Sequence, residues 1–199
     1  MKKVDLTQGK VLSVIAALAI PIMGSSLLQF TYNIVDMFWV GGLGSNAVAS
    51  VGSASFFVGL GYSINTLVVI GAGIKVSHAL GRNEEHESKA YINSGIFVNF
   101  ILGLLYAIIL IFAGKYFIGF LNLGNEVVEN GANLYLMISA PMLFFSFFNQ
   151  MYIRILGSYG HNSSALRIST VGIALNIILD PIFIYTFKFG VLGAAIATL

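Results

Sequence analysis

Long apolar runs separated by short polar breaks dominate this sequence. They extend approximately over residues 11–40, 47–76, 91–112, 131–156 and 165–187. A helix that crosses a bilayer needs about 20 mostly apolar residues. In lipid, such a helix also satisfies its own backbone hydrogen-bonding groups, which an isolated strand cannot do. The pattern therefore predicts an all-α fold, a polytopic membrane bundle with five transmembrane helices.

Composition supports this reading and excludes several other classes. Of the 199 residues, 57% are hydrophobic and 9% are charged, whereas a soluble domain carries roughly 25% charged residues. The formal net charge of +2 is too small to indicate a nucleic-acid partner. The chain has no cysteine, so disulfides, thiolate metal sites and a cysteine nucleophile are excluded.

The two ends of the sequence each need an interpretation. A sixth apolar run begins at Phe189 and holds only 11 residues before Leu199, about half of a membrane crossing. We therefore expect a fragment that ends inside a sixth helix. At the start, Lys2, Lys3 and Lys10 resemble the basic region of a signal peptide, but the following apolar run is far longer than a signal core. We expect an uncleaved first helix.

Basic residues predict the orientation, because Lys and Arg prefer the cytoplasmic ends of membrane helices. With a cytoplasmic N-terminus, only Lys115 and Lys188 of the ten basic residues face outward. The other eight fall on the cytoplasmic side: Lys2, Lys3, Lys10, Lys75, Arg82, Lys89, Arg154 and Arg167. The prediction is a multi-pass protein of the plasma membrane with its N-terminus in the cytoplasm.

Two acidic residues, Asp36 and Asp180, lie inside predicted membrane helices, while the other six fall in the N-terminal segment or in loops. An ionisable residue inside a membrane helix costs a few kcal/mol on insertion scales, so it usually faces a cavity or a partner and marks a functional site. The alternative for each is a solvated carboxylate near a helix end. The two helices run in the same direction, so both acids are expected in the outer part of the membrane.

Polar residues accompany Asp36 along the first helix. Ser25, Gln29, Tyr32 and Asp36 are spaced four, three and four residues apart, which places them on one helix face. We interpret Ser25, Gln29 and Tyr32 as candidates for lining a cavity that ends at Asp36.

In the fifth helix, Asn176 and Asp180 share a face and Pro181 follows directly. Proline has no N–H, so the carbonyl of Ile177 loses its helical donor. Carboxylate, amide and carbonyl oxygens suit a small cation, and a carboxylate can hold a proton instead. Pro21, Pro141 and Pro181 are candidate helix bends, either moving bends of a transporter or static kinks.

Several separated segments resemble the multidrug and toxic compound extrusion (MATE) family, and most closely its bacterial DinF-like branch. They are LLQFTYNIVDMFWVGGLGSNAVASVG (27–52), GAGIKVSHALG (71–81), LNIILDPIFIY (175–185) and GAAIAT (193–198), with Pro21 in the first helix. The resemblance implies about twelve helices in two six-helix lobes. The chain would then be an incomplete N-terminal lobe, residues 1–199, without the C-terminal lobe.

The same resemblance implies an antiporter that exchanges Na+ or H+ for cationic or amphipathic organic compounds. By position, its cation site would be Asp36, Asn176, Asp180 and Thr198, with Tyr32 nearby, and Na+ would use Asp36, Asn176 and Asp180. Such a protein is not an enzyme and has no cofactor besides the transported ion. Its partners would be the lipid bilayer, a small organic cation and the missing C-terminal lobe.

Three alternatives remain beside the antiporter. A flippase for lipid-linked saccharide would need a basic central cavity, and no Lys or Arg falls centrally in a helix. An intramembrane aspartyl protease would carry Gly-x-Gly-Asp, whereas Ile34-Val35 precedes Asp36 and Ile178-Leu179 precedes Asp180. The last alternative is a truncated chain that inserts into the membrane but transports nothing.

Overall fold

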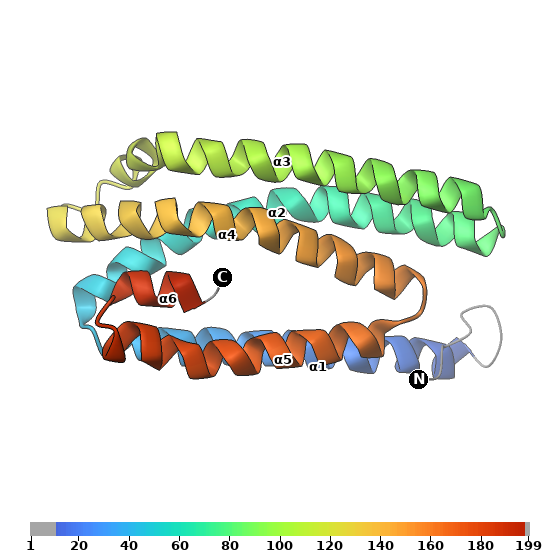
Figure 1. Cartoon of the computed structure of the whole chain (residues 1–199), viewed down its shortest axis with the longest axis horizontal. Helices are drawn as coiled ribbons and strands as arrows, with labels where there is room; N and C mark the ends of the chain where they lie inside the picture. The colour runs from blue at the N-terminus through green and yellow to red at the C-terminus, as the bar shows by residue number, and fades with distance from the viewer. Residues whose placement is uncertain (1–10, 198–199) are drawn as a thin grey trace.

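A computed structural model describes residues 11–197 and shows an all-helical chain over that range. The elements are α1 (Val11–Gly41), α2 (Ser45–Gly81), α3 (Glu85–Phe120), α4 (Glu126–Ser158), α5 (Asn162–Pro181), the π-helical turn η1 (Ile182–Thr186) and α6 (Val191–Ala197) (Figure 1). Five spans, α1 to α4 and α5 together with η1, are long and apolar enough to cross a membrane. The predicted fold class is confirmed.

Most helices extend beyond the apolar runs, because polar residues stabilise their ends. The start of α4 shows this: the Asn125 side chain accepts hydrogen bonds from the backbone N–H groups of Val127 and Val128, at 3.0 and 3.4 Å. Glu126 and Glu129 occupy its first turn, where negative charge is favourable to the helix dipole. Hydropathy reports the membrane-embedded part of a helix and misses such ends.

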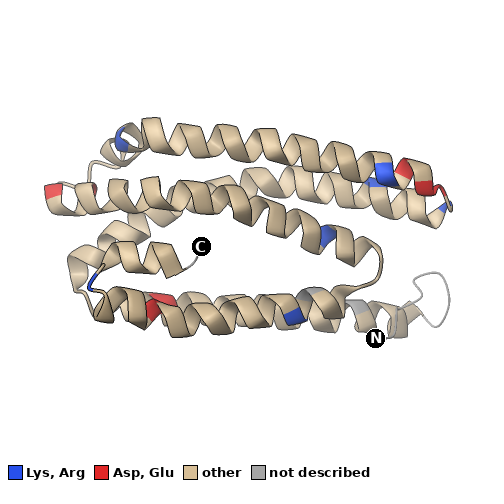
Figure 2. Cartoon of the chain, in the orientation of Figure 1, with Lys and Arg blue, Asp and Glu red and all other residues tan. Residues whose placement is uncertain are grey.

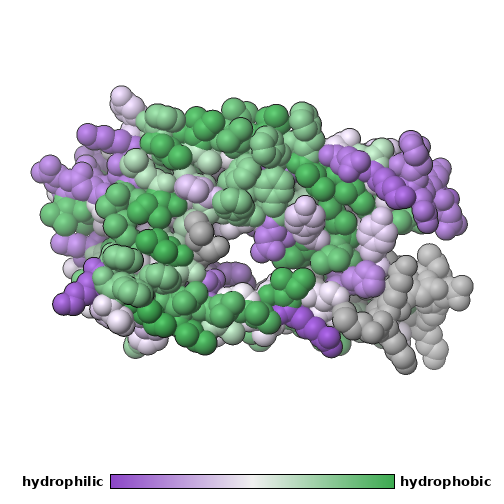
Figure 3. Space-filling view, viewed as in Figure 1, coloured by the Kyte–Doolittle hydropathy of each residue, from purple (hydrophilic) through white to green (hydrophobic). Residues whose placement is uncertain are grey.

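The helices form two groups, which are joined at one end through α6 and at the other by the α4–α5 connection (Figure 1). Helices α2, α3 and α4 pack on one another, and α1 packs along α5 (Figure 1). Helix α6 contacts both α4 and η1, so it joins the groups at the end where the α1–α2 and α5–α6 connections lie. The space-filling view shows an opening between the groups and a broad apolar band between more hydrophilic ends (Figure 3).

Close helix approaches build the core of the α2–α3–α4 group. The ring of Tyr106 on α3 occupies the space beside Gly61 on α2, and its hydroxyl donates a 2.6 Å hydrogen bond to the Phe57 carbonyl. Leu136 and Phe147 of α4 are almost completely buried there. Small residues permit such approaches between membrane helices.

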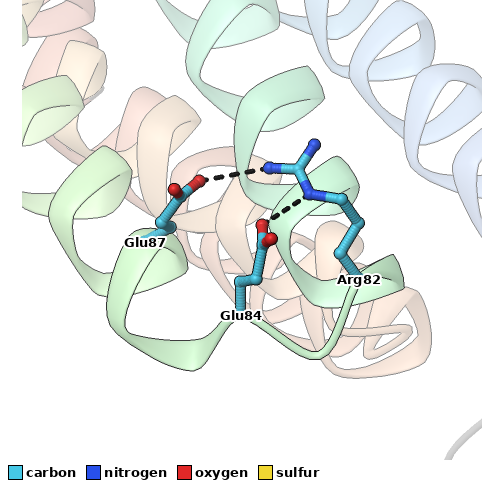
Figure 4. A network of polar contacts seen from close by, with 3 residues as sticks. All are labelled: Arg82, Glu84 and Glu87. Atoms are coloured by element: carbon cyan, nitrogen blue, oxygen red, sulfur yellow. Dashed lines mark hydrogen bonds and ion pairs between the residues drawn. The ribbon is translucent and has the colours of Figure 1, made fainter.

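Charged residues gather mainly at the two ends of the bundle (Figure 2). In the α2–α3 turn, Arg82 pairs with Glu84 and, at 3.1 Å, with Glu87 (Figure 4). The hydrogen bond that Arg82 donates to Glu84, followed by the negative charge of Glu84, raises the pKa of the Arg82 guanidinium. Exposed pairs of this kind contribute little to stability.

The three prolines have different surroundings. Pro21 and Pro141 lie inside α1 and α4, which both continue past them, and α4 changes direction near its middle (Figure 1). Pro181 is the last residue of α5, and the chain then widens into η1, where the Phe187 N–H donates to the Ile182 carbonyl at 2.9 Å. A π-helical turn shifts the register of the helix and is frequent at functional sites.

Candidate functional site: a buried carboxylate pair

Asp180 lies in the last turn of α5 and is completely buried, with 0% of its surface exposed. After this turn comes η1, and helix α6 packs against it. A Cβ atom on Gly193 would come within 2.6 Å of the Phe183 carbonyl carbon, so only glycine permits α6 to pack this closely on η1. The next residues on α6, Ala194 and Ala195, are buried as well.

Asp36 lies near the end of α1, which packs along α5. It is half-buried, and its carboxylate is close enough to Asp180 for the two charges to act on each other. The fold therefore brings together two acids that are far apart in the sequence.

Three oxygens of this pair have no hydrogen-bond partner among residues 11–197: Oδ1 of Asp36 and both Oδ atoms of Asp180. A buried carboxylate without a partner is costly, by several kcal/mol for an ion in an apolar medium. Two carboxylates near enough to act on each other also repel one another when both are ionised. A bound cation or proton would remove both penalties, so the arrangement is chemically suited to hold one.

The other residues of the predicted cation site have different positions. Asn176 is half-buried on α5, one turn before Asp180. Thr198 lies outside the described residues, directly after Ala197. Tyr32 is buried on α1, one turn before Asp36.

The remaining two candidates for a cavity lining make hydrogen bonds within α1. The Ser25 hydroxyl donates to the Pro21 carbonyl at 3.0 Å. The exposed Gln29 amide donates to Asn33 Oδ1 at 3.4 Å. Both hydrogen bonds stay within α1, and Tyr32 is the one fully buried member of the stripe.

Sequence reasoning missed Tyr135 on α4. Both Asp36 and Asp180 are close enough to act electrostatically on its hydroxyl, which hydrogen-bonds with Ser139 one turn later. The four-residue spacing of two polar residues in an apolar helix is the same signal that identified the stripe on α1. Through Tyr135, the α2–α3–α4 group also borders the carboxylate pair.

The fold and this pair define a polytopic helical membrane protein with ionisable groups inside its bundle, a feature typical of transporters. Comparison with known proteins identifies which kind. The family model described as MatE matches residues 21–182, and the chain therefore belongs to the MatE family of membrane transporters, as the motifs predicted.

Individual relatives agree with this assignment. The probable multidrug resistance protein YpnP of Bacillus subtilis is 27% identical over all of this chain and 45% of its own length. The multidrug export protein MepA of Staphylococcus saprophyticus is 31% identical over 90% of this chain and 40% of its own length. A solved structure, an outward-facing multidrug resistance MATE family transporter of the MOP superfamily, superposes with a TM-score of 0.90 at 30% identity.

That solved structure matches all of this chain, which covers 44% of it. The chain thus spans less than half the length of the relatives it matches. Its match to known transporters covers their N-terminal lobe.

Proposed function

We propose that this chain forms the cation-coupling lobe of an antiporter that exports cationic or amphipathic organic compounds. One observation carries the proposal: two carboxylates lie together inside the membrane bundle, and three of their oxygens have no partner in the described chain. The names of the relatives YpnP and MepA support multidrug export as the transport class. In this proposal the N-terminus is cytoplasmic, and the membrane is the plasma membrane.

The proposed roles follow from position. Asp36 and Asp180 hold Na+ or H+, Asn176 and Thr198 supply further oxygens, and Tyr32 and Tyr135 border the pair. Coupling requires the ion to bind two shapes of the lobe with different affinity. Because Asp36 and Asp180 come from α1 and α5, and Tyr135 from the other helix group, a change in the opening between the groups alters the site.

Direct ion binding by the chain tests the first half of the proposal. We expect the purified chain in dodecylmaltoside to bind ²²Na⁺ if Na+ couples, and to take up protons at these acids as the pH is lowered if H+ couples. Asp36→Asn and Asp180→Asn should each abolish binding, whereas Glu85→Gln, an exposed control, should not. If Na+ binds neither wild type nor control, and neutralising the acids also leaves proton uptake unchanged, the cation role is wrong.

Transport is tested separately, in a chimera that joins this chain to the remaining part of YpnP. Everted vesicles with the chimera should accumulate ethidium when an ion gradient is applied, and Asp36→Asn should abolish this while leaving membrane insertion intact. Vesicles with the chain alone should be inactive, because the proposed route for the substrate runs between two lobes. Accumulation of ethidium by the Asp36→Asn chimera would refute the coupling role.

The flippase alternative differs in the charge it requires. A saccharide carrier with a pyrophosphate group needs Lys or Arg in its central cavity, whereas the buried polar side chains of the described residues are serines, asparagines and Asp180, with no Lys or Arg among them. We therefore favour the exporter.

A further inference from the structure

A second polar cluster lies in the core of the α2–α3–α4 group, and neither the carboxylate pair nor its neighbours include it. Asn65 on α2 and Asn99 on α3 are both completely buried, with 0% of their surface exposed. Asn65 Nδ2 donates a 3.4 Å hydrogen bond to Oε1 of Gln150 on α4. All three side chains are neutral carboxamides.

Glycine contacts on either side place Asn99 in the same layer as Asn65. Gly95 faces Ala72 of α2, and Tyr106 faces Gly61. The α3 contacts at residues 95 and 106 are eleven residues apart, and so are the α2 contacts at residues 72 and 61. The antiparallel register is therefore constant between them, and it puts Asn99 opposite residue 68. That position is one turn from Asn65.

The same reasoning places Asn99 against α4. One turn before it, Gly95 faces Met151, and one turn after it, Gly103 faces Phe144 and Phe147. Asn99 shares the face of these two glycines and therefore points at the α4 segment that contains Gln150. Three helices thus bring one carboxamide each to a common layer.

Three of the four side-chain polar atoms of Asn65 and Asn99 are unpaired within the described chain. Among residues 11–197, no group hydrogen-bonds to Asn65 Oδ1 or to either Nδ2 or Oδ1 of Asn99. Their surroundings are apolar, since Val69 and Met151 are buried beside them. Unpaired polar groups are costly in such a medium, and buried water molecules commonly satisfy them with two to four hydrogen bonds.

We propose that Asn65 and Asn99 bind a water molecule that bridges α2 and α3 beside Gln150. The atoms to be satisfied comprise two acceptor oxygens and one donor nitrogen, and water serves both kinds. A cation could bind the oxygens but would leave the Asn99 N–H groups unpaired, and the cluster has no charge to balance it. The bridge would hold the three helices together as one unit, independently of cation coupling.

The direction of a stability change tests the proposal. Asn99→Leu keeps the side-chain size and removes both polar atoms. If the water bridge exists, the thermal midpoint of the chain in dodecylmaltoside should fall, by about 2–4 °C for each kcal/mol lost. If the atoms are simply unpaired, the midpoint should rise, because an apolar group of similar shape is then better. Asn93→Leu, on the exposed face of α3, is the control.

Nuclear magnetic resonance tests the water directly on the wild-type chain, so the proposal stays testable if Asn99→Leu does not fold. With ¹⁵N-labelled asparagine, the Asn99 Nδ2 hydrogens should show a cross-peak at the water frequency, and Asn65→Leu should weaken it. Absence of the cross-peak, or a higher midpoint for Asn99→Leu, would overturn the proposal.

The effect of Na+ on the thermal midpoint distinguishes a bound cation from a bound water molecule at this site. The rise of the midpoint in NaCl relative to choline chloride should be the same in wild type and in Asn99→Leu, since the cation belongs elsewhere. A rise that Asn99→Leu abolishes would replace water by Na+ at this site and refute the proposal.

Discussion

The hydroxyl of Tyr185 donates a 2.6 Å hydrogen bond to the main-chain carbonyl of Trp39, and the two rings meet edge to face with centroids 6.1 Å apart. Tyr185 belongs to η1, directly after the Asp180–Pro181 turn, and Trp39 belongs to the last turns of α1, directly after Asp36. The contact therefore ties together the two chain segments that carry the carboxylate pair.

Tyr185→Phe should loosen this connection. It removes one hydrogen bond, which is worth about 0.5–1.5 kcal/mol, so we expect a lower thermal midpoint. Trp39 is the single tryptophan of the sequence, so its fluorescence reports the change, and its emission should shift to longer wavelength. Tyr116→Phe, at a tyrosine that is 80% exposed, is the control. Unchanged emission and midpoint in Tyr185→Phe would show that the contact does not hold α1 to η1.

Neutralising Asp180 should separate the two candidate ions. If Na+ couples, the site is ionised without Na+, and Asp180→Asn should raise the thermal midpoint in choline chloride because it removes repulsion and an unpaired buried charge. It should also abolish the further rise of the midpoint that NaCl causes in wild type. That rise reflects a stabilisation of about 2.7 kcal/mol when Na+ is at 100 times its Kd.

If a proton couples instead, Asp180→Asn should change the midpoint little at neutral pH and NaCl should have no specific effect. Differential scanning fluorimetry in the two salts measures both quantities. A large drop of the midpoint in choline chloride would contradict both versions, because it would mean that the ionised Asp180 has a stabilising partner.

Gly193→Ala should displace α6 from η1. The added Cβ would lie 2.6 Å from the Phe183 carbonyl carbon and 2.7 Å from the Ile184 nitrogen, and backbone atoms cannot rotate away. Overpacking of this kind costs about 1–3 kcal/mol. Thermal unfolding measures the loss, and Gly119→Ala, where a Cβ would contact nothing within 4 Å, is the control. Equal midpoints for the two variants would show that α6 does not pack on η1 this tightly.

Arg82→Gln should leave the thermal midpoint unchanged. Its ion pairs with Glu84 and Glu87 are exposed to solvent, and water and salt screen such pairs. Unfolding at low and at high salt checks this. A clear drop at low salt that disappears at high salt would instead show that the pairs stabilise the α2–α3 turn.

Much of the helix pattern follows from the sequence alone. Hydropathy located all five candidate membrane spans of the described residues, and the end of α1 at Gly41 lies one residue beyond the first apolar run. The ends differ more, as at Glu85 and Asn125, because capping and dipole interactions extend helices into water beyond the membrane. The predicted helix to residue 187 instead changes type after Pro181, since proline withholds a backbone donor from the α-helical pattern.

Part of the cation-site hypothesis rests on features that can be recognised in the sequence alone. Asp36 and Asp180 were found because a charge is rare in an apolar run, and Asn176 because it lies one turn away on the same helix. Tyr135 was missed because polar residues four apart in a helix are common, and only the position of α4 distinguishes it from a lipid-facing tyrosine.

The sequence by itself determined that this chain is a helical membrane protein with two acids in its spans, since hydrophobicity and helix period are local properties of consecutive residues. Only the tertiary structure decided that those acids come near enough to act on each other, that Tyr135 is within reach of their charge, and that Asn65 and Asn99 share a layer. Each of these relations depends on the packing of different helices, which is set by side-chain shape at contacts such as Gly61 with Tyr106 and Gly193 with Phe183.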